Sequence, residues 1–363
     1  MTATGTAPSN LSVDFIEFYV SDARASAADL VASYGFEVVG TAGTPDVDAG
    51  GHLSVAVRQR GITLLLTEAL DDQHPAGLFV QRHGDGVANI GLGTPDARTA
   101  YAAAVAGGAQ PVAPPAEYPD GAVTATIGIF GDVTHTFIQR PAAAELPGFV
   151  ATTPEPAPGA APAPALHEVD HFAVCLEAGT LDQTVALYEA ALGFEVIFEE
   201  RIVVGAQAML SRVVQSPSRQ VTFTLIEPDS SAEAGQIDDF LKDNAGPGVQ
   251  HVAFRTENIV PAISALVGRG VAFLNTPAAY YRLLAERLDL ARYGTDELRE
   301  LNILVDEDHD GQLFQIFARS THPRRTFFFE VIERLGARTF GSGNIKALYA
   351  AVEAERISTP GLP

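Results

Sequence analysis

The sequence predicts a chain of two similar halves, each built from two strand–helix units followed by further strands. Three observations lead to this. The chain has 363 residues, which exceeds the usual size of one hydrophobic core. Residues 141–167 are rich in Pro and Ala without hydrophobic periodicity, as in an extended connector. The segments on its two sides resemble each other. We therefore expect an N-terminal domain at residues 1–140 and a C-terminal domain at residues 168–363.

The internal repeat can be followed in three pairs of segments. Ile16–Gly40 resembles the segment from Asp170 onward, and both contain a strand, an amphipathic helix and the letters GFEV. Gly86–Pro114 resembles Gly248–Pro277, and Ile127–Arg140 corresponds to Asp308–Arg319. A repeat of this length indicates that both halves fold in the same way.

Composition excludes several classes of partner. The chain is 47% hydrophobic and 19% charged, as in ordinary globular proteins. Its formal net charge of −22 repels phosphate backbones and anionic membranes, so we expect neither nucleic acid nor membrane as a partner. A small anionic substrate would need a local positive centre, which a bound metal can supply.

Cysteine usage and hydropathy indicate a cytoplasmic protein. The single cysteine, Cys175, excludes an internal disulfide and a cysteine-based metal cluster. The first residues show no basic start followed by an apolar stretch, and no apolar run is long enough to span a bilayer.

Two histidines lie on strand faces with small neighbours. Alternation along residues 170–175 places His171 on one face with Ala173 and Cys175. In residues 249–254, His251 shares a face with Val249 and Ala253. Small neighbours leave room for a metal and for something bound to it.

Glu330 interrupts the apolar run of residues 327–332, and a buried carboxylate needs a cation or strong donors. Two imidazoles and one carboxylate are the donors of the facial-triad iron site. Each residue alone could also be an ordinary hydrogen-bonded core or edge residue. The matching positions of the histidines in the repeat favour a metal. The same alignment places Glu17 at the position of His171 and Asn89 at that of His251, so we expect one metal site, in the second half only.

Other patterns are weaker. Residues 306–311 resemble the start of a calcium loop, but its twelfth position is Phe317, so the bidentate glutamate is missing. We interpret this segment as a solvated acidic turn. The remaining histidines, His83 and His135 among them, show no paired spacing, and we interpret them as surface or loop residues.

The motifs VDHFAV, GVQHVAF, GQLFQIF, FFFEVIER and FGSGNIKALY together carry a resemblance. Along essentially its whole length the chain resembles the 4-hydroxyphenylpyruvate dioxygenase family of the vicinal oxygen chelate superfamily. The resemblance implies an α+β fold of tandem βαβββ modules forming half-open barrels, with a C-terminal helix closing the active site. It implies Fe(II) on His171, His251 and Glu330, with O2 and an aromatic 2-oxo acid, 4-hydroxyphenylpyruvate, as substrates. We also expect a homodimer.

Members of this family form one of two products, homogentisate or 4-hydroxymandelate. Those that form homogentisate usually carry Asn at the position of Ile226, and Phe at the positions of Ile345 and Tyr349. The resemblance therefore favours oxidative decarboxylation with benzylic hydroxylation to 4-hydroxymandelate, a reaction that feeds antibiotic biosynthesis, with homogentisate formation as the alternative. Four polar residues match cavity positions of the family: Ser211, Gln236, Gln250 and Gln315. Strand alternation predicts that Gln250 points away from His251.

Two further classes remain open. Some chelate-fold proteins bind small molecules without catalysis, and metal analysis would separate them from an enzyme. Extradiol ring-cleaving dioxygenases can share the fold and the triad, but the C-terminal segment favours the 2-oxo acid enzymes.

Overall fold

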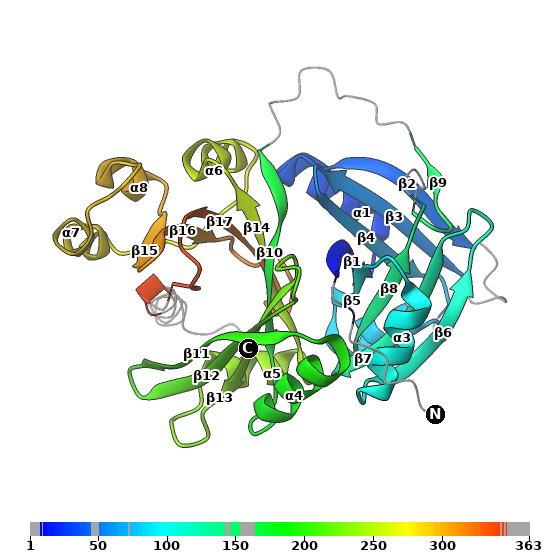
Figure 1. Ribbon diagram of the computed structural model, residues 1–363. Coiled ribbons are helices and arrows are strands. Elements are labelled where there is room, and N and C mark those ends of the chain that lie inside the picture. Colours follow the sequence, from blue (N-terminus) through cyan, green and yellow to red (C-terminus); the bar gives the residue numbers. More distant parts are fainter. Residues whose placement is uncertain are drawn as a thin grey trace.

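The computed structural model describes residue 8 and residues 10–44, 51–71, 73–141, 146–152, 164–341, 343, 344 and 346. Within them, the strands form two curled sheets, one for each half of the chain (Figure 1). The first sheet, blue to cyan, has nine strands and the second, green to red, has eight. None of the described helices is long and apolar enough to cross a membrane.

The first half contains the following elements: β1 (Ser12–Tyr19), α1 (Ala23–Asp29), a π-helical turn (Leu30–Tyr34), β2 (Glu37–Thr44), β3 (His52–Gln59), β4 (Ile62–Ala69), α2 (Pro75–His83), β5 (Gly86–Gly93), α3 (Ala97–Ala106), β6 (Gln110–Glu117), β7 (Val123–Phe130), β8 (Val133–Gln139) and β9 (Val150–Ala151).

The second half contains a similar series of elements: β10 (Leu166–Cys175), α4 (Leu181–Leu192), β11 (Glu195–Val204), β12 (Gln207–Gln215), β13 (Thr222–Pro228), α5 (Gln236–Asp243), β14 (Gly248–Thr256), α6 (Ile259–Gly268), α7 (Ala278–Arg287), α8 (Thr295–Glu300), β15 (Leu304–Asp308), β16 (Gly311–Phe317) and β17 (Phe328–Leu335).

Each sheet consists of two βαβββ modules joined side by side. The first sheet runs β6-β7-β8-β5-β1-β4-β3-β2-β9, and the second runs β11-β12-β13-β10-β14-β17-β16-β15. The first strands of the two modules pair antiparallel, β1 with β5 and β10 with β14. The predicted α+β fold of tandem βαβββ modules is therefore confirmed. Its last module carries an insertion, because α7 and α8 lie between α6 and β15.

The last strand of every module carries, at or near its end, a Glu or Gln whose side chain caps the helix of the same module. A carboxylate or amide oxygen there accepts a backbone N–H that the first helical turn leaves without a partner. The four residues are Glu68, Gln139, Glu227 and Glu333, which accept from the N–H groups of Ala23, Ala97, Leu181 and Ile259 at 3.1, 3.2, 2.9 and 2.7 Å. This shared contact fixes how the modules correspond.

The correspondence corrects two of the sequence alignments. Ile16 pairs with Leu64 as Phe172 pairs with Phe223, so Phe15, not Glu17, lies at the position of His171. The predicted match of Glu17 with His171 was therefore wrong by two residues. Alternation along a strand could not reveal the error, because a shift by two residues leaves the same residues on each face. Strand β8 corresponds to β17 and not to β16, because each is the last strand of its module and lies beside the first strand, β5 or β14. Asn89 does lie at the position of His251, because its partners Glu17 and Thr134 match Ala173 and Phe328.

The interior of the first half is packed where the second half carries His171. The ring of Phe15 lies against Gly91, where an added Cβ would meet ring carbons at 2.5 Å. Phe15 and Leu146 belong to the same cluster of buried side chains. Nearby, the partly buried carboxylate of Glu17 accepts hydrogen bonds from Thr67 at 2.8 Å and from Asn89 at 3.0 Å. A single metal site per chain stays a prediction.

The two halves pack through α3 and α4 and through aromatic side chains. Gly107 allows close approach, because a Cβ there would lie 2.3 Å from the carbonyl oxygen of Ala190. His135 is fully buried and its Nε2 hydrogen-bonds the Tyr188 hydroxyl at 2.8 Å across the interface. His83 is also buried, between Asp132 and the carbonyl oxygen of Asn244. The interpretation of these two histidines as surface or loop residues was wrong, because spacing along the chain carries no information about contacts between domains.

We predict that Glu227→Ala lowers the free energy of unfolding by roughly 1–3 kcal/mol, because two N–H groups at the start of α4 lose their acceptor. Glu227→Gln should cost clearly less, since Gln139 serves the same purpose in another module. Urea titration followed by circular dichroism measures both. Equal losses in the two variants would contradict the capping role.

Candidate active site

The register of the second sheet places a continuous set of side chains on its inner face. Residues that pair across neighbouring strands point to the same side. Glu330 pairs with Ala253, and Ala253 pairs with His171. In the same way His251 pairs with Ala173, and Ala173 pairs with Thr224. Three polar side chains from β10, β14 and β17 therefore meet around two alanines.

His171, His251 and Glu330 form a buried cluster, with side chains that are 5%, 9% and 1% exposed. Nε2 of His171 lies 3.4 Å from Glu330 Oε2, and Nε2 of His251 lies 3.3 Å from the same oxygen. All three potential ligand atoms lie within 4.8 Å of one another. Glu330 Oε1 is buried and makes no hydrogen bond within the described residues.

Each histidine is oriented by the residue before it. Asp170 Oδ1 accepts from Nδ1 of His171 at 2.9 Å, and Gln250 Oε1 lies 3.4 Å from Nδ1 of His251. Both Asp170 and Gln250 are the extra residue of a β-bulge between β10 and β14. A bulge turns its extra side chain toward the face of its neighbour, so the prediction that Gln250 points away from His251 was wrong. With Nδ1 as the donor to these oxygens, Nε2 of each ring faces the cluster and is the atom that would bind a metal.

Electrostatics favour different protonation states for the two rings. Burial lowers the pKa of His251. Burial acts in the same direction on His171, but the carboxylates of Glu330 and Asp170 outweigh it and raise its pKa to about 9. Burial alone would raise the pKa of Glu330, yet the charge of His171 lowers it. The cluster thus holds an ionised carboxylate, a neutral imidazole and an imidazole that carries a proton until a metal replaces it.

These residues fit a divalent metal. Two imidazole nitrogens and a carboxylate converge, and the carboxylate has a buried oxygen without a donor. The neighbours Ala173 and Ala253 are small and buried, so neither places a bulky side chain against the cluster. This donor set leaves further coordination positions open for substrate.

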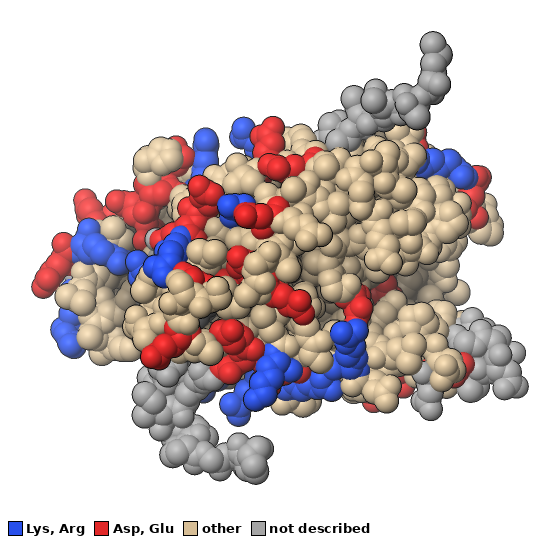
Figure 2. Space-filling view, turned by 90° about the horizontal axis from the view of Figure 1, so that it is seen from below, with Lys and Arg blue, Asp and Glu red and all other residues tan. Residues whose placement is uncertain are grey.

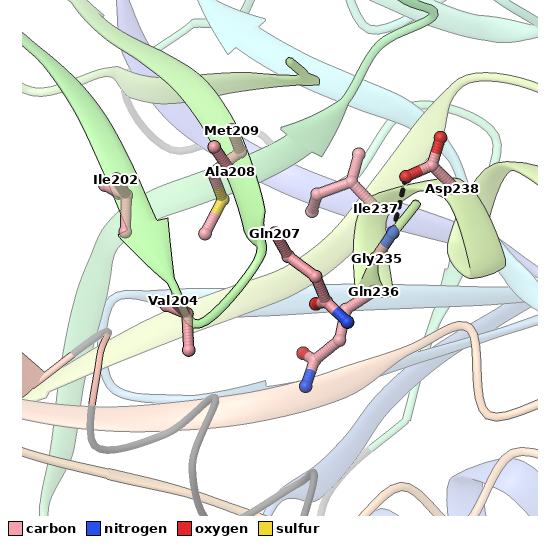
Figure 3. A pocket seen from close by; sticks show the side chains of 9 residues that line it. All are labelled: Ile202, Val204, Gln207, Ala208, Met209, Gly235, Gln236, Ile237 and Asp238. Carbon is pink, nitrogen blue, oxygen red and sulfur yellow. Dashed lines mark hydrogen bonds between the residues drawn. The ribbon is translucent and has the colours of Figure 1, made fainter. Parts of the chain in front are cut away.

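The inner face continues from the cluster to an apolar wall. Ile226 pairs with Cys175 and with Ser211, so all three point inward. Figure 3 shows the pocket at this end of the face, between β12 and α5, where the side chains of Gln207 and Gln236 approach each other. The pocket is lined by Ile202, Val204, Gln207, Ala208, Met209, Gly235, Gln236, Ile237 and Asp238.

Polar atoms without partners surround the same space. Gln236 Nε2 at the pocket, Thr224 Oγ1 on β13 and Gln315 Oε1 on β16 are buried and make no hydrogen bond within the described residues. Gln315 pairs with Ile332, which lies two residues from Glu330 on β17. Gln315 therefore lies on the same face of the sheet as Glu330. Of the residues predicted to contact substrate, Ser211, Ile226, Gln236 and Gln315 thus lie on or beside this face. Ile345 and Tyr349 lie outside the described residues.

A second acidic cluster, Asp308, His309 and Asp310, lies at the turn between β15 and β16. The carboxylate of Asp308 already accepts backbone N–H groups from Asp310, Gly311, Arg338 and Thr339. Through its hydrogen bonds with Arg338 and Thr339, the Asp308 carboxylate holds the chain that follows β17. On the face shown in Figure 2, Lys and Arg side chains are interspersed with Asp and Glu, mainly over the C-terminal half.

Comparisons with known proteins agree on one family. A family model described as "Hydroxyphenylpyruvate dioxygenase, HPPD, N-terminal" matches residues 8–145, and one for the "Glyoxalase/Bleomycin resistance protein/Dioxygenase superfamily" matches residues 168–316. The 4-hydroxyphenylpyruvate dioxygenase of Dictyostelium discoideum is 33% identical, over 94% of this chain and 97% of that protein. That of Caenorhabditis elegans is also 33% identical, over 94% and 91%. The chain belongs to the 4-hydroxyphenylpyruvate dioxygenase family.

A solved structure from this family is also similar. A triply substituted 4-hydroxymandelate synthase from Streptomyces coelicolor has a TM-score of 0.86 and 42% identity, covering 97% of this chain and 100% of that one. The protein is therefore an enzyme, a dioxygenase of the 4-hydroxyphenylpyruvate dioxygenase family. Sequence analysis missed Asp170 and Arg334 beside the cluster; an acid next to a proposed ligand histidine was the available signal.

We predict that His171→Ala, His251→Ala and Glu330→Ala each abolish metal binding and turnover while the fold is retained, because each removes one of three donors. Inductively coupled plasma mass spectrometry should find about one metal per chain in wild type. Asn89→Ala in the first half serves as the control and should not change that ratio. Full metal content in any triad variant would refute the assignment.

We further predict that binding of Co(II) releases about one proton per metal near neutral pH, because only His171 carries a proton there. The apparent affinity for Co(II) should therefore rise with pH up to the His171 pKa of about 9 and level off above it, because protons no longer compete with the metal. Calorimetric titration in buffers of different ionisation enthalpy counts the protons. Release of two protons would mean that His251 is also charged.

Proposed function

We propose that the protein is an Fe(II)-dependent dioxygenase that converts 4-hydroxyphenylpyruvate and O2 into 4-hydroxymandelate and CO2. His171, His251 and Glu330 would hold the iron. The convergence of these three side chains, with Glu330 Oε1 lacking any donor, is the observation that carries the proposal. One oxygen atom of O2 would enter the carboxylate formed as CO2 leaves, and the other the hydroxyl group on the benzylic carbon.

When bound, iron would supply a positive centre for the 2-oxo acid group and the means to activate O2. The chain supplies the rest of the site. Glu330 brings one negative charge, so the iron retains a positive charge to offset the substrate carboxylate in an otherwise acidic protein. Asp170 and Gln250 fix the tautomers of the two rings by their contacts with Nδ1.

The inner face offers distinct contacts for an aromatic substrate. Ile202, Met209 and Ile237 form an apolar wall, and Cys175 and Ile226 belong to the same buried cluster. Gln236 Nε2 can donate to a phenol oxygen, since it is buried without a partner at this end of the face. Thr224 and Gln315 lie nearer the metal ligands in the sheet and can contact the 2-oxo acid end. Ser211, the neighbour of Ile226, completes the polar contacts.

The product would depend on how the ring lies against this wall. Ile226 is buried beside Cys175 and Ser211, where an Asn would place an amide in the cavity. An apolar wall lets the ring turn so that the benzylic carbon, not the ring, faces the metal. The 42% identity to a 4-hydroxymandelate synthase supports this product. The alternative, homogentisate, is favoured by curated relatives such as those of D. discoideum and C. elegans. A homodimer, a cytoplasmic location and a part in antibiotic biosynthesis stay predictions.

We predict that wild-type enzyme forms mainly 4-hydroxymandelate and that Ile226→Asn shifts the product ratio toward homogentisate. A change of ~1.4 kcal/mol between competing barriers alters the ratio tenfold. Chromatography of products from 4-hydroxyphenylpyruvate measures it.

The matched control is Ile202→Asn, which places the same amide elsewhere on the wall. It should lower turnover without the same shift in product. If wild type forms mainly homogentisate, the choice of product is wrong while the metal site stands. If both Asn variants shift the ratio equally, Ile226 has no special position.

A further inference from the structure

Both halves contain the same Asp–Arg ion pair. In the first half, Arg140 contacts Asp14 at 2.5 Å, and in the second half Arg334 contacts Asp170 at 2.8 Å. Each arginine directly follows the capping residue of its module, Gln139 or Glu333. Each aspartate is the extra residue of a bulge, in β1 or in β10. The pair is therefore a part of the repeated fold, in which the end of the last strand holds the bulge of the first.

The two pairs differ in the use of one carboxylate oxygen. Asp14 Oδ1 is buried and makes no hydrogen bond within the described residues, and the residue after it is Phe15. Asp170 Oδ1 accepts from Nδ1 of His171 as well as from Arg334. Arg334 binds both oxygens of Asp170, through Nε and one terminal nitrogen, each at 2.8 Å. This bidentate contact fixes the plane of the carboxylate and so the direction of its contact with His171.

Arg334 also holds the chain that follows β17. Its other terminal nitrogen donates to the carbonyl oxygens of Ala337 at 3.3 Å and Thr339 at 2.7 Å. Its guanidinium lies over the ring of Phe340, 4.9 Å from the centroid. The same ring packs edge-on against the imidazole of His171, with centroids 5.0 Å apart. One side chain thus contacts both the partner of His171 and the segment 337–340 that covers it.

We propose that Arg334 is a positioning residue that couples the docking of segment 337–340 to the orientation of His171, through Asp170. The inference rests on the proposed metal site. When the segment is docked, Phe340 and Asp170 hold the imidazole from two sides, with its Nε2 toward Glu330. When the segment leaves, Arg334 loses two acceptors and an aromatic face, and its hold on Asp170 becomes looser. Metal binding and docking of the segment then stabilise each other.

The first half provides a matched control within the same chain. Arg140→Met removes an equivalent ion pair that has no histidine beside it, whereas Arg334→Met removes the pair beside His171. The affinity for Co(II) alone, measured by competition with a chromophoric chelator, should fall about 10–100-fold in Arg334→Met and in Asp170→Asn. It should stay within about threefold of wild type in Arg140→Met. The visible bands of bound Co(II) should change in the first two variants only.

Hydrogen exchange provides a second readout. In wild type, Co(II) should slow amide exchange in residues 337–340, and in Arg334→Met and Asp170→Asn this slowing should be lost. Arg334→Lys keeps the charge without the bidentate contact and should be intermediate in both measurements.

The outcomes separate the two proposals. If wild type binds no Co(II), the metal site itself is wrong. If wild type binds Co(II) and Arg334→Met binds it equally well, or loses no more affinity than Arg140→Met, Arg334 is only a structural contact and the coupling is refuted. If Arg334→Met fails to fold, Arg334→Lys and Asp170→Asn decide by the same criteria.

Discussion

The buried carboxylate of Glu330 is the constraint on which the second half of this protein depends. A carboxylate that is 1% exposed, inside an apolar strand, is costly unless cationic or donor groups surround it. Nε2 of two histidines faces one of its oxygens, and its other oxygen has no donor within the described residues. Glu330 is therefore placed for a metal ion, and the strands β10, β14 and β17 are registered so that the two histidines meet it. Without a metal, the proton on His171 provides the compensating charge.

The repeat explains how one scaffold carries different side chains on the inner faces of its two halves. The helix caps, the bulges and the Asp–Arg pair occur in both halves, so they belong to the fold. The difference lies in a few inner-face positions. In the first half the ring of Phe15 packs against Gly91, whereas His171 and Ala253 lie at these positions in the second half. The proposed metal ligands thus lie at positions whose backbone geometry is shared by both halves. In the second half Asp170, which belongs to the shared ion pair, also contacts His171.

Much of this arrangement was predictable from the sequence. The repeat predicted the modules, alternation placed His171 and His251 beside small residues, and an acid in an apolar run identified Glu330 as unusual. The failures have physical causes. Alternation repeats every two residues, so it could not exclude the two-residue error that aligned Glu17 with His171 in the repeat. It also assumes a regular strand, and the bulges at Asp170 and Gln250 break that rule. Contacts between the halves, such as His135 with Tyr188, leave no local pattern, and the same holds for the contacts of Arg334 with segment 337–340.

Anomalous diffraction at the iron edge, from crystals loaded with Fe(II) under anaerobic conditions, tests the central claim most directly. The account predicts one strong peak per chain, coordinated by Nε2 of His171, Nε2 of His251 and a carboxylate oxygen of Glu330. The peak should face the inner surface that carries Thr224 and Ile226. A peak in the first half, beside Glu17 and Asn89, or a peak that lacks any one of the three ligands, would contradict it.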